Sequence, residues 1–285
     1  MTKISYVSDL HLEFPNHRPS FMNDEGGDVL ILAGDITTAA MLRPNRTDKE
    51  ARSHVKYLGE KFKRQLIDKY TYVLYVMGNH EHYGYMFNDT KQGLLDGFAR
   101  LGMEKIKILD NDVFTVNGVA FIGTTLWSDF ENGNPQSMLI CQRGMNDFRI
   151  IGKELWTGKY GSTEMIPITP SFILGEFERS KKFIEMMATE EMVGDKKVVV
   201  VTHHGPTNIS LNDMHVGNGM DGAYCSNLTN LIYDRPKIKY WIHGHTHQNF
   251  DYIVGDTDCR VLACQQGYDF ERSYIDFDGT RSFEL

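Results

Sequence analysis

Five short clusters of histidine, aspartate and asparagine are spread along this 285-residue chain, and each lies at or near the end of an apolar run. Carboxylate oxygen and imidazole nitrogen are ligands for Mn, Fe and Zn ions, and a carboxylate can bridge two such ions. A pair of metals lowers the pKa of a shared water and orients a phosphate group. The clusters therefore predict two metal ions and phosphoryl chemistry; they are Asp9-Leu10-His11, Gly34-Asp35, Gly78-Asn79-His80-Glu81, His203-His204 and His243-Gly244-His245-Thr246-His247.

The apolar runs before these clusters predict buried strands. They cover residues 4–7, 29–32, 72–76, 198–201 and 240–242. In a parallel sheet all strands point the same way, so residues just past the strand ends meet at one edge, where such folds place their active sites. We therefore expect the five clusters to converge at one edge.

Helical patterns alternate with these runs, as an α/β architecture requires. A capping-box pattern at Thr47-Asp48-Lys49-Glu50 opens an amphipathic stretch, a shorter helix is expected over 91–101, and Thr169-Pro170 opens a helix to about Met187. The runs 106–109, 113–116 and 119–122 are separated by turn signals, including Asn117-Gly118, and predict antiparallel strands that join the sheet.

Length and apolar content are compatible with one domain over residues 1–285. The least regular part is 123–168, which we expect to be a functional loop or lid. Arg149 in this segment is a candidate phosphate clamp, because a guanidinium can hold two phosphate oxygens. Its neighbours could line a substrate pocket or pack in the core; these are Trp127, Asp129, Asn146, Asp147 and Phe148.

Composition narrows the class of protein. A net charge of -8 argues against a broad surface for duplex nucleic acid, but leaves open a small phosphorylated substrate or a locally held single strand. The four cysteines are widely spaced and predict reduced thiols. Since no signal-peptide pattern or membrane-spanning run is present in the sequence, we expect a cytoplasmic protein.

Each cluster alone has an ordinary structural explanation. Asp9 and His11 could be spaced this way by chance, and Gly34-Asp35 could be a turn with a capping carboxylate. The alternating imidazoles of 243–247 are harder to explain structurally, because alternate positions of an extended segment face one side. All five clusters in this order, each associated with a strand, favour the metal site.

With these blocks the chain resembles the calcineurin-like metallophosphoesterases, whose motifs are Asp-x-His, Gly-Asp, Gly-Asn-His-Asp/Glu, a His after a strand, and Gly-His-x-His. The resemblance implies an α/β fold, a four-layer αββα sandwich of two mixed sheets with the site at the carboxyl ends of strands. It implies that a first metal is held by Asp9, His11 and His247, a second by Asn79, His203 and His245, and that Asp35 bridges them.

The resemblance also implies in-line attack on phosphorus by a metal-bridging hydroxide, with His80 as general acid or charge stabiliser for the leaving oxygen. Manganese is the expected metal, with Fe, Zn, Ni or Mg as alternatives. His204, beside His203, is a candidate substrate contact.

The second block departs from the phosphoprotein phosphatases of this family. It reads Gly34-Asp35-Ile36-Thr37-Thr38-Ala39-Ala40 and lacks the Asp that orients the catalytic His and the Arg that binds phosphate. The pattern resembles small bacterial and phage-type phosphohydrolases instead. We expect a small, nucleotide-like phosphomonoester or phosphodiester as substrate. The alternatives are a metal-dependent nuclease acting on DNA or RNA, and a catalytically idle metal-binding scaffold or nucleotide sensor.

Overall fold

The apolar runs form the strands of two stacked sheets in the computed structural model, which describes residues 1–16, 18–19, 25–156, 163–213 and 216–285. The first sheet has the order β13-β1-β2-β3-β4. Its central strands are β1 (Lys3–Val7), β2 (Gly27–Ala33) and β3 (Tyr70–Val76), which are parallel, and it ends in β4 (Ile106–Ile108) and the antiparallel β13 (Ser282–Glu284).

The second sheet has the order β11-β12-β10-β9-β6-β5. Four parallel strands form its centre, β12 (Arg260–Ala263), β10 (Ile238–His243), β9 (Lys197–Thr202) and β6 (Val119–Thr124). Its antiparallel edges are β11 (Phe250–Ile253) and β5 (Asp112–Val116).

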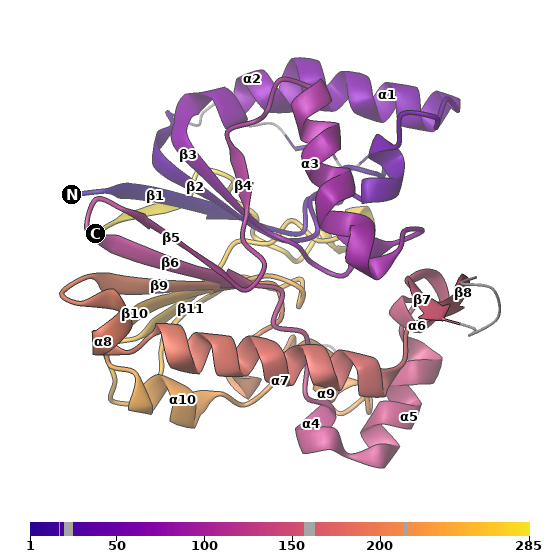
Figure 1. The fold of residues 1–285 in the computed structure, drawn as a ribbon. Coiled ribbons are helices and arrows are strands. Elements are labelled where there is room, and N and C mark those ends of the chain that lie inside the picture. The colour runs from indigo at the N-terminus through magenta and orange to yellow at the C-terminus, as the bar shows by residue number, and fades with distance from the viewer. Residues whose placement is uncertain (17, 20–24, 157–162, 214–215) are drawn as a thin grey trace.

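Helices cover the outer face of each sheet, which gives the four layers expected from the resemblance (Figure 1). α1 (Lys49–Tyr57), α2 (Lys63–Gln65) and α3 (Thr90–Arg100) lie over the first sheet. α7 (Pro170–Met187), α8 (Glu190–Val193) and α10 (Thr229–Asp234) lie along the second.

The valines of β9 show why these sheets stack. Val199 and Val201 pack in the core shared with the first sheet, whereas Val198 and Val200 pack in the core beneath α7. Successive side chains of a strand point to opposite faces, so a strand between two apolar layers must be apolar throughout.

Several predicted element boundaries hold and others are wrong. The Asn117-Gly118 turn has both residues at positive φ, 50° and 77°, and joins β5 to β6 as predicted. The prediction that residues 106–109 join an antiparallel group is wrong, because β4 pairs in parallel with β3 and buries Ile106 and Ile108 in the first core. The first long helix is capped by Asp48, whose carboxylate accepts from the Ala51 N–H at 2.9 Å.

The segment 123–168 is more regular than its sequence suggests. It contains α5 (Pro135–Gly144), α6 (Asp147–Ile150) and a hairpin of β7 (Gly152–Trp156) and β8 (Thr163–Pro167), preceded by α4 (Phe130–Gly133), a single turn with left-handed backbone angles. The Asn134-Pro135 pair looks like a turn in sequence, yet Asn134 caps α5 and Pro135 occupies its first turn. These elements lie beyond the carboxyl ends of the second sheet's strands (Figure 1). Among the described residues, no helix combines the length and apolarity needed to cross a bilayer.

Candidate metal centre

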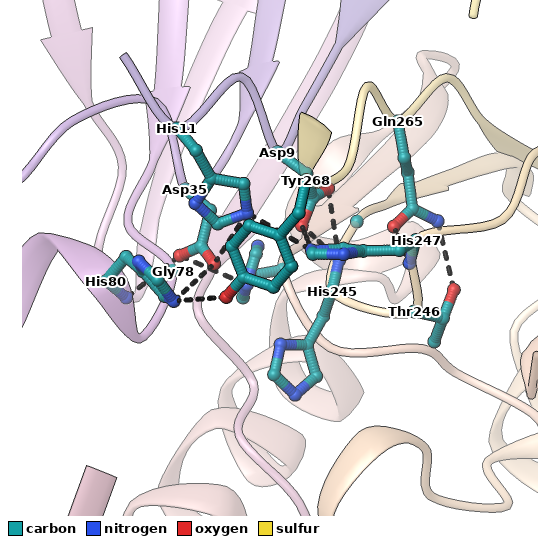
Figure 2. Close-up of polar contacts among 12 residues, drawn as sticks. Asp9, His11, Asp35, Gly78, His80, His245, Thr246, His247, Gln265 and Tyr268 are labelled. Carbon is teal, nitrogen blue, oxygen red and sulfur yellow. Dashed lines mark hydrogen bonds and ion pairs between the residues drawn. The ribbon is translucent and has the colours of Figure 1, made fainter. Parts of the chain in front are cut away.

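The strand ends of the two sheets converge (Figure 1), and the clusters that follow them are in contact there, His247 with Asp9 and His203 with Asp35 and Asn79. Ligand atoms of Asp9, His11 and His247 all lie within 4.8 Å of one another. The same limit holds for Asp35, His203 and His245. In Figure 2 the side chains of Asp9, His11, Asp35 and His247, which come from both sheets, lie close together.

The backbone at these residues is strained. Five of the predicted ligands have positive φ, a conformation that non-glycine residues rarely adopt: Asp9 at 54°, His11 at 44°, Asp35 at 54°, His245 at 71° and His247 at 50°. Each such residue costs on the order of 1–3 kcal/mol and persists only where its surroundings fix it. The fold therefore fixes the backbone of this centre tightly, as a site that must position ligand atoms requires.

The motif glycines leave room for the polar side chains. A Cβ on Gly34, whose φ is +88°, would lie 2.3 Å from Nδ1 of His203. A Cβ on Gly244 would lie 2.5 Å from Oδ2 of Asp9. Both glycines are thus required by close approach of candidate ligands.

Asp35 lies between the two groups of candidate ligands. Its Oδ1 is 3.4 Å from Nε2 of His203, and its Oδ2 is 4.0 Å from Nε2 of His11 and of His80. Burial raises the pKa of Asp35, but the positive charges of His203 and His80 outweigh burial and hold it well below the usual range. The carboxylate therefore stays ionised, with one oxygen directed to each side.

The donor set fits divalent cations. Nε2 of His245 is buried and has no hydrogen-bond partner among the described residues, which is costly for a polar atom unless something binds it. Burial and the neighbouring His204 and His203 keep the pKa of His245 well below its usual value, so its imidazole is neutral, the form that binds metals. Nε2 of His11 and Nε2 of His247 lie 3.1 Å apart and approach one point.

Surrounding residues hold the candidate ligands in place. Nδ1 of His203 lies 2.9 Å from the Ala33 carbonyl, and Nδ1 of His247 lies 2.6 Å from Oε2 of Glu271. The Asn79 amide donates to Asp147 at 2.9 Å, which leaves its Oδ1 free to point toward His203, 3.1 Å away. Such partners fix the orientation of ring and amide groups around metals.

Glu81 joins the loops after β2 and β3. Its buried carboxylate accepts from the backbone N–H groups of Asp35 at 2.9 Å, Ile36 at 2.8 Å and Gly78 at 2.6 Å. Because its oxygens are used in this way, the structure places Glu81 in support of the loops rather than among the candidate ligands.

His80 is held between two groups that the sequence did not reveal. Its Nδ1 lies 2.9 Å from Oε1 of Glu13, and its Nε2 lies 3.0 Å from the Tyr268 hydroxyl (Figure 2). Its ring also stacks on Tyr83 at 4.1 Å between centroids. Burial lowers the pKa of His80, but the carboxylates of Asp35 and Glu13 outweigh burial and raise it to about 8. These two carboxylates therefore favour the protonated ring of His80.

Glu13 provides the carboxylate that orients His80, a group that the second cluster does not provide. The second cluster has no aspartate after Asp35 that could orient His80, and Glu13, two residues beyond the first cluster, supplies the carboxylate instead. Its position two residues after His11 was a usable signal, whereas Tyr268 is 188 residues from His80 in sequence and only the fold brings it near.

The remaining predicted contacts lie elsewhere. His204 is buried behind His245, with ring centroids 4.1 Å apart, and packs against Trp127. Arg149 is exposed on α6, where it donates to the Arg143 carbonyl and lines a separate groove. The structure therefore brings neither side chain to the lining of the pocket beside the candidate ligands.

That pocket has a volume of about 310 Å³ and opens over Asp35, His80 and His245. Asn146 and Met145, in the predicted loop or lid segment, form part of its wall. The side chains that line the rest of the pocket include Tyr83, Met220, Tyr224, Tyr268 and Phe270. Trp127 and Phe148 are buried in the core of the second sheet.

Comparisons with known proteins identify the family and the fold. A family model described as calcineurin-like phosphoesterase matches residues 2–249. An uncharacterised protein of Acanthamoeba polyphaga mimivirus is 26% identical over 313 residues, which cover 98% of this chain and 98% of that protein. The crystal structure of phosphopantetheinyl hydrolase from Mycobacterium tuberculosis has the same fold, with a TM-score of 0.63 and 17% identity over 99% of this chain and 95% of that one.

Proposed function

The chain belongs to the calcineurin-like phosphoesterase family and is therefore a metal-dependent phosphoester hydrolase, and from that premise we propose that it uses two divalent cations to cleave a small phosphate ester. Asp9, His11 and His247 hold one cation in this proposal. Asn79, His203 and His245 hold the other.

The observation that carries this proposal is the placement of Asp35, whose two oxygens face the two groups of ligands. When bound, two cations about 3.5–4 Å apart lower the pKa of water and neutralise the charge of a phosphate. Nitrogen and oxygen ligands without any thiolate favour manganese or a similar cation over a structural zinc site.

His80 gives its proton to the departing alkoxide. Its Nε2 lies 4.0 Å from Oδ2 of Asp35 and faces the pocket, so a phosphate ester seated there brings the leaving oxygen within reach. Glu13 holds the opposite nitrogen, Nδ1, and so fixes the direction of the ring. Proton transfer from a positioned histidine contributes about 10²- to 10⁴-fold to a rate.

A small substrate, nucleotide-like in size, fits the pocket volume of about 310 Å³. The structural neighbour named phosphopantetheinyl hydrolase supports a small phosphorylated substrate in this fold. The negative net charge of -8 is unfavourable for stable duplex binding. Family membership leaves no reason to retain the alternative of an idle scaffold.

The test compares 4-nitrophenyl phosphate with its diester, using protein stripped with a chelator and then loaded with Mn²⁺. We expect hydrolysis only in the loaded protein, at least about 100-fold less in Asp35→Asn, and no change in Asp195→Asn, an exposed matched control. Undiminished turnover in loaded Asp35→Asn would refute the two-cation proposal. Incubating the Mn²⁺-loaded protein with linear DNA tests the nuclease alternative; if no strand is cut, that alternative is excluded.

A further inference from the structure

The mouth of the pocket carries an exposed aromatic ring that packing does not explain. Phe270 is 75% exposed and lies in the short 3₁₀ turn Asp269–Glu271. A phenylalanine left in water forgoes the burial that normally stabilises it, so a ring held at a pocket mouth suggests a binding contact.

Phe270 belongs to a column of flat rings that begins at the metal centre. Its ring stacks on Tyr268 with centroids 5.6 Å apart and planes 26° apart. Tyr268 in turn stacks on His11 with centroids 4.6 Å apart and planes 27° apart. Figure 2 shows Tyr268 lying beside His11 and His80, with its hydroxyl directed to His80.

Other residues that line the pocket are also largely apolar. They include Tyr224, Met145 and Met220, all of which are half-buried. Methionine side chains adapt their shape and make favourable contacts with ring edges. The pocket therefore combines polar candidate ligands at its base with aromatic and thioether side chains that can contact a flat organic group.

Charge limits what else the pocket can bind. Among the described residues that line it, the ionisable side chains besides histidine and tyrosine are Asp35 and Glu271, and none is lysine or arginine. The cations proposed for the floor neutralise one phosphate group. Apart from the histidines beside the proposed cations, a second or third phosphate would meet no cationic side chain among these described residues and would face Glu271.

We propose that Phe270, backed by Tyr268, forms a stacking platform for the base of a nucleotide, and that the pocket selects esters with one phosphate over di- and triphosphates. This inference rests on the proposed function, because it takes the phosphate to be seated at Asp35. A nucleoside monophosphate and a dinucleoside phosphodiester both fit this proposal, because each has a single phosphate group next to a flat base.

The experiment measures binding by calorimetry and turnover by phosphate or nucleoside release, on Mn²⁺-loaded protein. Adenosine 5′-phosphate is compared with ribose 5-phosphate, which has the same phosphate without a base. Stacking of one base on an aromatic side chain corresponds to roughly a 5- to 150-fold change in affinity. We expect the base to tighten binding to the wild type by about this factor, and Phe270→Ala to remove most of the difference.

Matched variants separate stacking from general damage. Phe270→Trp retains a flat ring and should keep the preference for the base, whereas Tyr233→Ala removes another exposed aromatic ring, on α10, and should change nothing. Phe270→Ala should leave the affinity for ribose 5-phosphate unchanged. Adenosine triphosphate should bind more weakly than the monophosphate, and a dinucleoside phosphate distinguishes the diester from the monoester.

Two outcomes overturn the platform. One is equal affinity of the wild type for the two monophosphates; the other is a base preference that survives in Phe270→Ala. Binding of the triphosphate as tight as that of the monophosphate, or tighter, would overturn selection for one phosphate. Absence of turnover on every ester would instead count against the proposed function, while the binding comparison would still decide the platform.

Discussion

Replacing Glu13 by Gln tests whether its carboxylate positions His80. The substitution keeps the shape of the side chain and removes the charge that lies 2.9 Å from Nδ1 of His80. A hydrogen bond to a charged partner contributes about 1.5–3 kcal/mol, so its loss in the transition state should lower kcat by about 10- to 150-fold. Glu178→Gln, an exposed control on α7, should leave kcat unchanged.

The choice of substrate distinguishes proton transfer from a general disturbance of the site. A 4-nitrophenolate departs without a proton, whereas an alkyl alkoxide requires one. The full loss of kcat is therefore expected for an alkyl phosphate ester, and a much smaller one for the 4-nitrophenyl ester. Metal content must be measured alongside, because Oε1 of Glu13 also lies 3.5 Å from Nδ1 of His11.

A double-mutant cycle gives the result that would refute this reasoning. If Glu13 acts through His80, then Glu13→Gln should have little further effect in a protein that already carries His80→Ala. Equal slowing of both ester types, or an undiminished effect in the His80→Ala background, would show that Glu13 acts otherwise.

Three further predictions concern the framework of the site. Glu81→Ala should lower the free energy of unfolding by about 3 kcal/mol or more in urea, because several buried N–H groups lose their acceptor; a loss below about 1 kcal/mol would contradict this. Gly34→Ala should cost about 1–3 kcal/mol and weaken metal binding by displacing His203, whereas Gly175→Ala, where a Cβ meets nothing within 4 Å, should not. Burial lowers the pKa of His54 to about 4. Between pH 6.5 and 4 the unfolded state therefore binds a proton that the folded state does not. As the pH is lowered through this range, the free energy of unfolding should decrease by up to about 3 kcal/mol more in the wild type than in His54→Asn.

The sequence predicted the site's location better than its supporting contacts. Candidate ligands were recognisable because each lies in a motif associated with a strand, and parallel strands bring such ends together. Glu271 and Tyr268 were missed because they come from the C-terminal tail and reach His247 and His80 only through the fold. No local periodicity marks such residues.

The segment 123–168 shows a different limit. Its helices are short, and the same Asn134-Pro135 pair that caps α5 also occurs in turns, so local propensity could not distinguish the two. Arg149 has the right chemistry for a phosphate clamp, but its direction depends on how α6 packs, and it points to another groove. Residue type alone therefore could not predict where this side chain lies.

The central claim is that two cations occupy the space around Asp35. Anomalous diffraction from crystals saturated with Mn²⁺ tests this most directly, because it locates each metal independently of activity. We predict two peaks per chain about 3.5–4 Å apart, one beside Asp9, His11 and His247 and the other beside Asn79, His203 and His245, with Asp35 in contact with both. A single peak, or two peaks that do not share Asp35, would contradict the account.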